Sequence, residues 1–185
     1  MSILSSLDQI VALYAAKGGL NYGEGISQLE HALQCAVLAQ EAGEPDSLVI
    51  ASLLHDIGHL EEDEAEVVQF ERDDRHEITG VRMLSRLFGP EVLQPIALHV
   101  AAKRYLCWKD PDYHAALSPA SQATLRLQGG AFDADQAQKF ERAPYHREAI
   151  ALRSFDDTGK RPEAAGVKFS DYIPIMRALI ISSVN

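Results

Sequence analysis

The run Leu54-His55-Asp56-Ile57-Gly58-His59 is the part of this sequence best equipped for chemistry. A histidine followed at once by an aspartate, within an otherwise apolar stretch, places two ionisable groups where water is scarce. Buried charged groups are paired or bound to a metal. Neighbouring helix residues point about 100° apart, so His55 and Asp56 converge only on something between their directions. A metal ion fits that position, and His59 follows His55 by one helical turn.

The rest of the chain offers further ligands of the same chemistry. His31, His76 and His99 each fall in a separate segment with helical periodicity, and Asp156 and Asp157 come late. Imidazole and carboxylate together suit Fe, Mn, Zn or Mg, with imidazole favouring the transition metals. Periodicity does not choose between Asp156 and Asp157. In His76-Glu-Ile-Thr-Gly80, the glycine lies one turn beyond the histidine, as a close approach of two helices requires.

The segments that must position these residues read as helices, so the predicted fold is all-α, one helical bundle domain over residues 1–185. Ser27 and Glu30 form a capping box for a helix that ends at Gly43. Asp46 is expected to cap a central helix over residues 48–60, which is apolar nearly all round. Residues 21–25 read as a loop. The other expected helices span residues 73 or 74 to 89, 90–106 with a bend at Pro95, 118–130, 133–143, 145–155 and 172–181.

Composition narrows the classes of partner. The net charge is −10, which argues against a nucleic-acid backbone. No run is apolar enough to span a membrane and the first residues do not read as a signal peptide, so we expect a cytoplasmic protein. Cys35 and Cys107 lie in apolar patterns and are expected to be buried thiols. The acidic run 61–66 reads as a solvated loop.

The order of these ligands, H…HD…H…H…D, resembles the HD-domain superfamily of metal-dependent enzymes over roughly residues 21–160. The resemblance implies a central bimetal site in which Asp56 bridges two ions. It also selects Asp156, because the family pattern has an aspartate four residues before a lysine, here Lys160. One ion is then held by His31, His55, Asp56 and Asp156, and the other by Asp56, His76 and His99.

Two classes of chemistry use this ligand set: phosphohydrolases, in which metals activate a water, and oxygenases that hold two irons. Residues near the expected ligands are therefore more telling. Lys103 lies one turn from His99 and Arg153 nearly one turn from Asp156. Ser121 and Thr124 open a helix, where hydroxyl and N–H groups can receive an anion. With His59, these residues predict a pocket for a tetrahedral anion beside the metals.

This combination resembles the HD-domain oxygenases of organophosphonate catabolism. The resemblance implies a mixed-valent Fe(II)/Fe(III) pair and O2-dependent cleavage of the carbon–phosphorus bond of a 1-hydroxy-2-(trimethylammonio or amino)ethylphosphonate. The products would be phosphate and glycine betaine or glycine. It implies Tyr22 and His59 as catalytic residues, and Tyr22, Glu24, His59, Lys103, Ser121, Thr124 and Arg153 as substrate contacts.

Tyr22 and Glu24 are expected to face the amine, and an aromatic and acidic surround favours the trimethylated form. The expected partners are the small organophosphonate, O2 and a preceding hydroxylase that supplies the 1-hydroxy substrate. No nucleic acid and no membrane are expected. The alternatives are an HD-domain phosphohydrolase acting on a nucleotide or phosphate monoester, and a metal-bound regulatory module.

Overall fold

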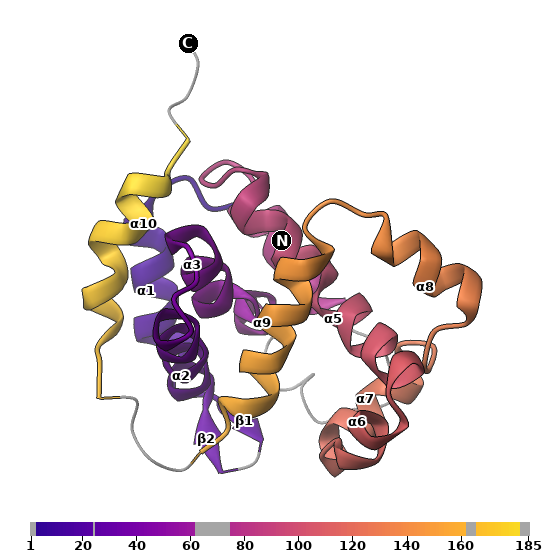
Figure 1. The fold of residues 1–185 in the computed structure, drawn as a ribbon. Coiled ribbons are helices and arrows are strands. Elements are labelled where there is room, and N and C mark those ends of the chain that lie inside the picture. The colour runs from indigo at the N-terminus through magenta and orange to yellow at the C-terminus, as the bar shows by residue number, and fades with distance from the viewer. Residues whose placement is uncertain (1–2, 24, 62–74, 162–165, 182–185) are drawn as a thin grey trace.

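The computed structural model describes residues 3–23, 25–61, 75–161 and 166–181, and in them helices dominate (Figure 1). The predicted all-α class is confirmed, apart from one two-stranded antiparallel sheet. In chain order the elements are α1 (Leu7–Lys17), β1 (Asn21–Gly23), β2 (Ile26–Ser27), α2 (Gln28–Glu41), α3 (Asp46–Leu54), the 3-10 helix η1 (Ile57–Glu61), α4 (His76–Leu84), α5 (Pro90–Lys109), α6 (Pro111–Ala116), α7 (Pro119–Leu127), α8 (Ala134–Glu141), α9 (His146–Thr158), the 3-10 helix η2 (Phe169–Tyr172) and α10 (Ile173–Leu179).

The helix α3 lies at the centre of the main core, as its apolar sequence predicts. Seven of its nine residues are buried, and α1, α2 and α10 gather around it (Figure 1). The long helix α5 packs along α9, and α9 stands between this core and the group formed by α6, α7 and α8. The helices α2, α3, α5 and α9 therefore meet at the middle of the molecule. Within the described residues, no helix is both long and apolar enough to cross a membrane.

Several local signals act as the sequence predicts. The capping box of Ser27 and Glu30 is present at the start of α2, and Asp133 forms another at α8. Ser118 caps α7 by accepting a hydrogen bond from the N–H of Ser121. Both cysteines are free and buried. Capping side chains satisfy N–H groups that a helix start leaves unpaired, so these residues fix where α2, α7 and α8 begin.

The helix predicted over residues 48–60 is interrupted at His55 and Asp56. The helix α3 ends at Leu54, and a 3-10 turn follows from Ile57. Two side chains bond the carbonyls at this end: His55 Nδ1 lies 2.9 Å from the Ser52 oxygen, and the Tyr14 hydroxyl donates to the Leu53 oxygen at 3.0 Å. An α-helix would offer these carbonyls to backbone N–H groups four residues on. The change of pitch separates the directions of His55 and His59, which the uninterrupted helix would have aligned.

Other predictions are also corrected. Residues 21–25 are not a plain loop, because Asn21–Gly23 pairs with Ile26–Ser27. Asp46 is the first residue of α3 without a side-chain capping bond, and α4 ends at Leu84, before Gly89. The last helix covers Ile173–Leu179, and α9 extends beyond the prediction to Thr158. Helices α1 and α6 were not predicted. The proposed cap at Asp73 or Asp74 and most of the acidic run lie outside the described residues.

The predicted close approach at Gly80 is confirmed. A Cβ atom on Gly80 would lie 3.2 Å from Ile57 Cγ2, and one on Gly58 would lie 2.1 Å from the carbonyl oxygen of His76. The second contact is with backbone, which has no flexible end to move aside. Gly58 and Gly80 therefore let η1 and α4 come close enough to bring His76 to the end of α3.

This contact predicts a large cost for Gly58→Ala. The added methyl group forces η1 and α4 apart, and overpacking of this kind lowers the free energy of unfolding by about 1–3 kcal/mol or more. Urea denaturation measures the loss. Gly19→Ala is the matched control, because nothing lies within 4 Å of the Cβ position there. Equal stabilities of the two variants would contradict the tight contact.

Candidate metal centre

Six ionisable side chains from five segments converge in the middle of the molecule. They come from α2, the end of α3, α4, α5 and α9, and each is at most 8% exposed. They are the six residues predicted as metal ligands: His31, His55, Asp56, His76, His99 and Asp156. Burial of this many ionisable groups is costly unless each has a partner.

The imidazole rings are held so that their Nε2 atoms face inward. Nδ1 of His31, His55 and His99 lies 2.8–2.9 Å from the backbone carbonyl oxygens of Gly159, Ser52 and Ile96, respectively. A carbonyl accepts and does not donate, so each Nδ1 carries the proton and each Nε2 presents a lone pair. This is the arrangement by which outer partners orient histidine ligands for a metal.

These nitrogens form two pairs, with Asp56 between them. The Nε2 atoms of His31 and His55 are 3.3 Å apart, and those of His76 and His99 are 3.1 Å apart. Asp56 Oδ2 lies 3.3 Å from His55 Nε2, while its Oδ1 lies 3.4 Å from His76 Nε2. Each carboxylate oxygen therefore faces one histidine pair, which is the arrangement of a bridging ligand.

The donor set fits metal ions. Neutral imidazoles that present lone pairs to each other at about 3 Å repel unless a cation lies between them. Two ligands at right angles with bonds of about 2.1 Å lie about 3.0 Å apart, close to the separations of each pair. Nitrogen and carboxylate donors together select a transition metal over calcium or magnesium. The site is therefore that of a metal cofactor, with residues for two ions.

The electrostatics of the site favour cations. Burial opposes ionisation of Asp56, yet His55 and His76 hold the pKa of its carboxyl well below the usual range. Burial and the neighbouring His76 push the pKa of His99 well below its ordinary value, which keeps that imidazole neutral and able to bind a metal. At His55 burial lowers the pKa, but Asp56 reverses this and raises it, so positive charge is favoured at its Nε2.

Asp156 completes the first histidine pair, and its two oxygens have different neighbours. Oδ1 lies 3.4 Å from His31 Nε2 and accepts a hydrogen bond from the Tyr22 hydroxyl at 3.2 Å. Oδ2 accepts from Arg153 Nη1 at 2.7 Å. Although burial opposes it, Arg153 holds the pKa of Asp156 well below its usual range. Asp157 accepts from Nε and Nη2 of the same guanidinium.

Cys35 also lies beside His31, and its Sγ and one ring nitrogen each of His31 and His55 lie within 4.8 Å of one another. Its Sγ is 3.8 Å from Nδ1 and 3.7 Å from Nε2 of the His31 ring, so it is equally distant from both nitrogens. The thiol donates to the Phe155 carbonyl oxygen at 3.6 Å, and Tyr22 stacks on the His31 ring at 3.8 Å between centroids. Cys35 and Tyr22 thus fix the plane of the imidazole.

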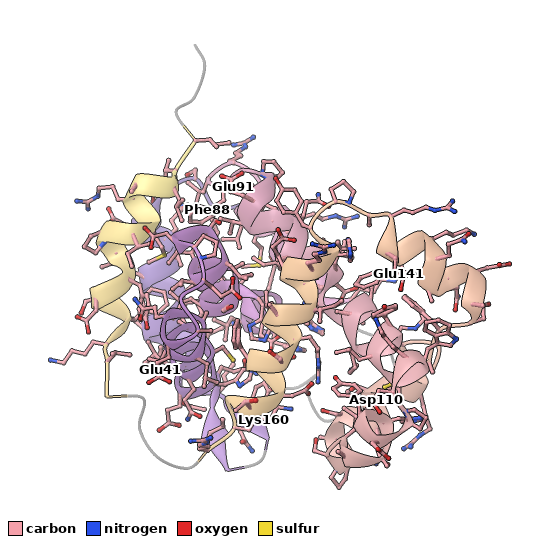
Figure 2. The ribbon with its side chains drawn as sticks, in the orientation of Figure 1. Glu41, Phe88, Glu91, Asp110, Glu141 and Lys160 are labelled. Atoms are coloured by element: carbon pink, nitrogen blue, oxygen red, sulfur yellow. The ribbon has the colours of Figure 1, made fainter. Side chains whose placement is uncertain are left out.

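Most of the residues predicted to bind an anion lie on α5, α7 and α9. Lys103 is 3% exposed, and its Nζ donates to the Thr124 hydroxyl at 3.0 Å. Lys160 Nζ lies 3.4 Å from the Ser121 hydroxyl, near the lower end of α9 in Figure 2. The Ser121 N–H, predicted as a possible anion donor, instead donates to the Ser118 cap. Positive groups and hydroxyls are therefore together, as a tetrahedral anion requires.

Two further residues predicted to contact the substrate are His59 and Glu24. His59 stacks on the metal-site ring of His76, with 4.1 Å between the ring centroids. Glu24 lies outside the described residues. Two tyrosines near the site were not predicted: Tyr14, which bonds the end of α3, and Tyr113, which bonds Asp157 and Arg153. The apolar spacing of Leu7, Ile10 and Tyr14 would have indicated α1. Asp110-Pro111 is a helix-start signal that would have indicated α6.

Comparison with known proteins identifies the family. The HD domain model matches residues 29–160, and the chain belongs to the HD-domain family. One relative is the [1-hydroxy-2-(trimethylamino)ethyl]phosphonate dioxygenase (glycine-betaine-forming) of Leisingera caerulea, 35% identical over 92% of this chain and 88% of that protein. Another is the hydroxymethylphosphonate dioxygenase of Gimesia maris, 44% identical over 81% of this chain and 74% of that protein.

The geometry predicts that Asp56→Ala abolishes binding of at least one of two metals, because both histidine pairs lose the oxygen that faces them. Elemental analysis of protein loaded with iron measures this as ions per chain. Asp135→Ala, an exposed aspartate on α8, should load like the wild type. Two ions retained in Asp56→Ala would exclude the bridging role.

Proposed function

We propose that this chain is a diiron dioxygenase that uses O2 to cleave the carbon–phosphorus bond of a 1-hydroxyalkylphosphonate. Two relatives of this chain bear the names of phosphonate dioxygenases, and their named substrates share a phosphonate on a hydroxylated carbon. The observation on this chain that carries the proposal is Tyr22, whose hydroxyl lies 3.2 Å from Asp156 Oδ1. A tyrosine poised to enter and leave a metal site suits an iron centre; hydrolysis does not need one.

The ligands of the two irons would be those that face each histidine pair. His31, His55 and Asp156 would hold one, His76 and His99 would hold the other, and Asp56 would be shared by both. Bound there, the iron pair would activate O2, which is the oxidant, for removal of the hydrogen from the hydroxylated carbon. The overall reaction balances with one O2 per substrate: the carbon leaves as a carboxylic acid and the phosphorus as phosphate.

The phosphonate is held by the cationic pocket. Arg153 has five N–H donors, and its bonds to Asp156, Asp157 and Tyr113 use the Nε–H and one from each terminal nitrogen. Two N–H groups remain for phosphonate oxygens, beside the ammonium of Lys103 and the hydroxyls of Ser121 and Thr124. His59, stacked on His76, orients the substrate from the other histidine pair.

The other end of the substrate would meet Tyr22. Tyr22 and Glu24 favour a trimethylammonio or amino group there, and the products are then glycine betaine or glycine with phosphate. Burial raises the pKa of Tyr22 well above its ordinary value, so its hydroxyl keeps the proton that it donates to Asp156. A preceding hydroxylase supplies the 1-hydroxy substrate, and the protein works in the cytoplasm.

Dependence on O2 tests the reaction class. With iron-loaded protein and [1-hydroxy-2-(trimethylammonio)ethyl]phosphonate or hydroxymethylphosphonate, phosphate release should match O2 consumption one to one. Phosphate release over many turnovers should stop when O2 is removed. Undiminished release without O2, or rapid hydrolysis of a phosphate monoester, would instead support an HD-domain phosphohydrolase.

The pH dependence of turnover tests Lys103. Burial, with the nearby charge of Arg153, lowers the pKa of its ammonium to about 8. The group is charged below that pH and loses its proton above it, so kcat/KM for hydroxymethylphosphonate should fall about tenfold per unit above about pH 8.

Lys103→Met should have a low kcat/KM at every pH, and its kcat/KM should not fall above about pH 8. Lys109→Met, an exposed lysine on the same helix, is the matched control and should keep the wild-type profile. A fall that survives in Lys103→Met belongs to another group.

A further inference from the structure

Tyr113 ties a helix without metal ligands to the metal centre. It lies on α6, three residues after Asp110, the N-cap of that helix, which Figure 2 labels. Its hydroxyl donates to Asp157 Oδ2 at 2.6 Å and accepts from Arg153 Nε at 3.2 Å. Burial raises the pKa of Tyr113 above its ordinary value, so the hydroxyl keeps the proton that it donates.

Asp157 and Tyr113 together fix the plane of the Arg153 guanidinium. Asp157 accepts from Nε at 3.0 Å and from Nη2, and Tyr113 bonds to both partners, so the three groups form a closed ring of hydrogen bonds. A guanidinium held at two nitrogens cannot rotate out of its plane. The remaining terminal nitrogen, Nη1, is thereby aimed at Asp156.

The direction of Nη1 decides which oxygen of Asp156 is left for a metal. Nη1 holds Oδ2 at 2.7 Å, so Oδ1 is the oxygen that faces His31 Nε2 at 3.4 Å. Without this restraint only the longer bond from the Tyr22 hydroxyl, 3.2 Å from Oδ1, would oppose rotation of the carboxylate about its Cβ–Cγ bond. Orientation of Asp156 therefore depends on a chain of contacts that begins on α6.

We propose that Tyr113 is a positioning residue of the metal centre: through Asp157 and Arg153 it sets the single oxygen that Asp156 presents to the ion on the His31 and His55 side. This rests on the metal site and on the proposed dioxygenase function. The ion on the His76 and His99 side has no ligand in this chain of contacts. Tyr113 therefore acts on one of the two ions, which distinguishes it from a residue that only stabilises the fold.

Metal affinity measured without substrate tests the proposal, and it does not depend on the reaction. The probe is Mn²⁺ alone, bound in competition with a chelator. His76→Ala leaves the His31 side as the intact site, and His31→Ala leaves the His76 side. Loss of an outer partner of a ligand typically weakens a metal site tenfold or more, and Tyr113 is one contact further out. Tyr113→Phe should weaken Mn²⁺ binding about three- to tenfold in the His76→Ala background and less than about twofold in the His31→Ala background.

Two further variants complete the experiment. Tyr105→Phe is the matched control, because its hydroxyl also bonds a carboxylate, that of Glu141 at 2.6 Å. Glu141 lies on α8, which holds none of the six candidate ligands. Tyr105→Phe should leave both affinities unchanged. Asp157→Asn should weaken the same side as Tyr113→Phe, and the double variant should be no weaker than Asp157→Asn alone.

Three results would overturn the proposal: no weakening in Tyr113→Phe, equal weakening on both sides, or the same effect from Tyr105→Phe. Each of them can arise whether or not the protein consumes O2. Conversely, the predicted weakening on one side could be found in a protein that releases no phosphate from hydroxyphosphonates. That result would support the role of Tyr113 and contradict the proposed function.

Discussion

The Asp56 carboxylate, buried among four imidazoles, is the group on which the rest of the centre depends. It is 8% exposed and stays ionised because positive charge is favoured around it. A carboxylate in this position is costly unless it is paired. Its two oxygens face different histidine pairs, so one residue determines the position of both. The four histidines lie 3.3–3.7 Å from the Asp56 oxygens, so the helices that carry them must pack close to this carboxylate.

The outer contacts give each ligand one orientation. Backbone carbonyls fix the tautomers of His31, His55 and His99, and Arg153 fixes Asp156. Partners of this kind govern ligand basicity and metal affinity almost as much as the ligands do. The carbonyl bonded by His55 comes from the turn that ends α3. The end of α3 leaves the Ser52 carbonyl for His55, and the contact with His55 in turn stabilises the end of the helix.

The convergence of the candidate ligands could be foreseen from the sequence, whereas their outer contacts could not. Histidines in separate apolar helices have few other uses, so His31, His76 and His99 stood out from spacing alone. The bridge made by Asp56 and the choice of Asp156 came from the family pattern. Tyr14 and Tyr113 were missed because their roles depend on packing between helices far apart in the chain. The break after Leu54 was missed because an apolar run cannot show that side chains compete for its carbonyls.

The five segments that carry ligands span the chain from residue 31 to residue 156, and this spread has a consequence for how the protein persists in a cell. An unfolded chain cannot gather such ligands, so metal binds only the folded form and adds to its stability by mass action. Each bound ion would join segments that are far apart in the chain. When metal is scarce, the inward lone pairs would repel one another and the folded form would lose this contribution to its stability. Metal supply would then set the lifetime of the protein as well as its activity.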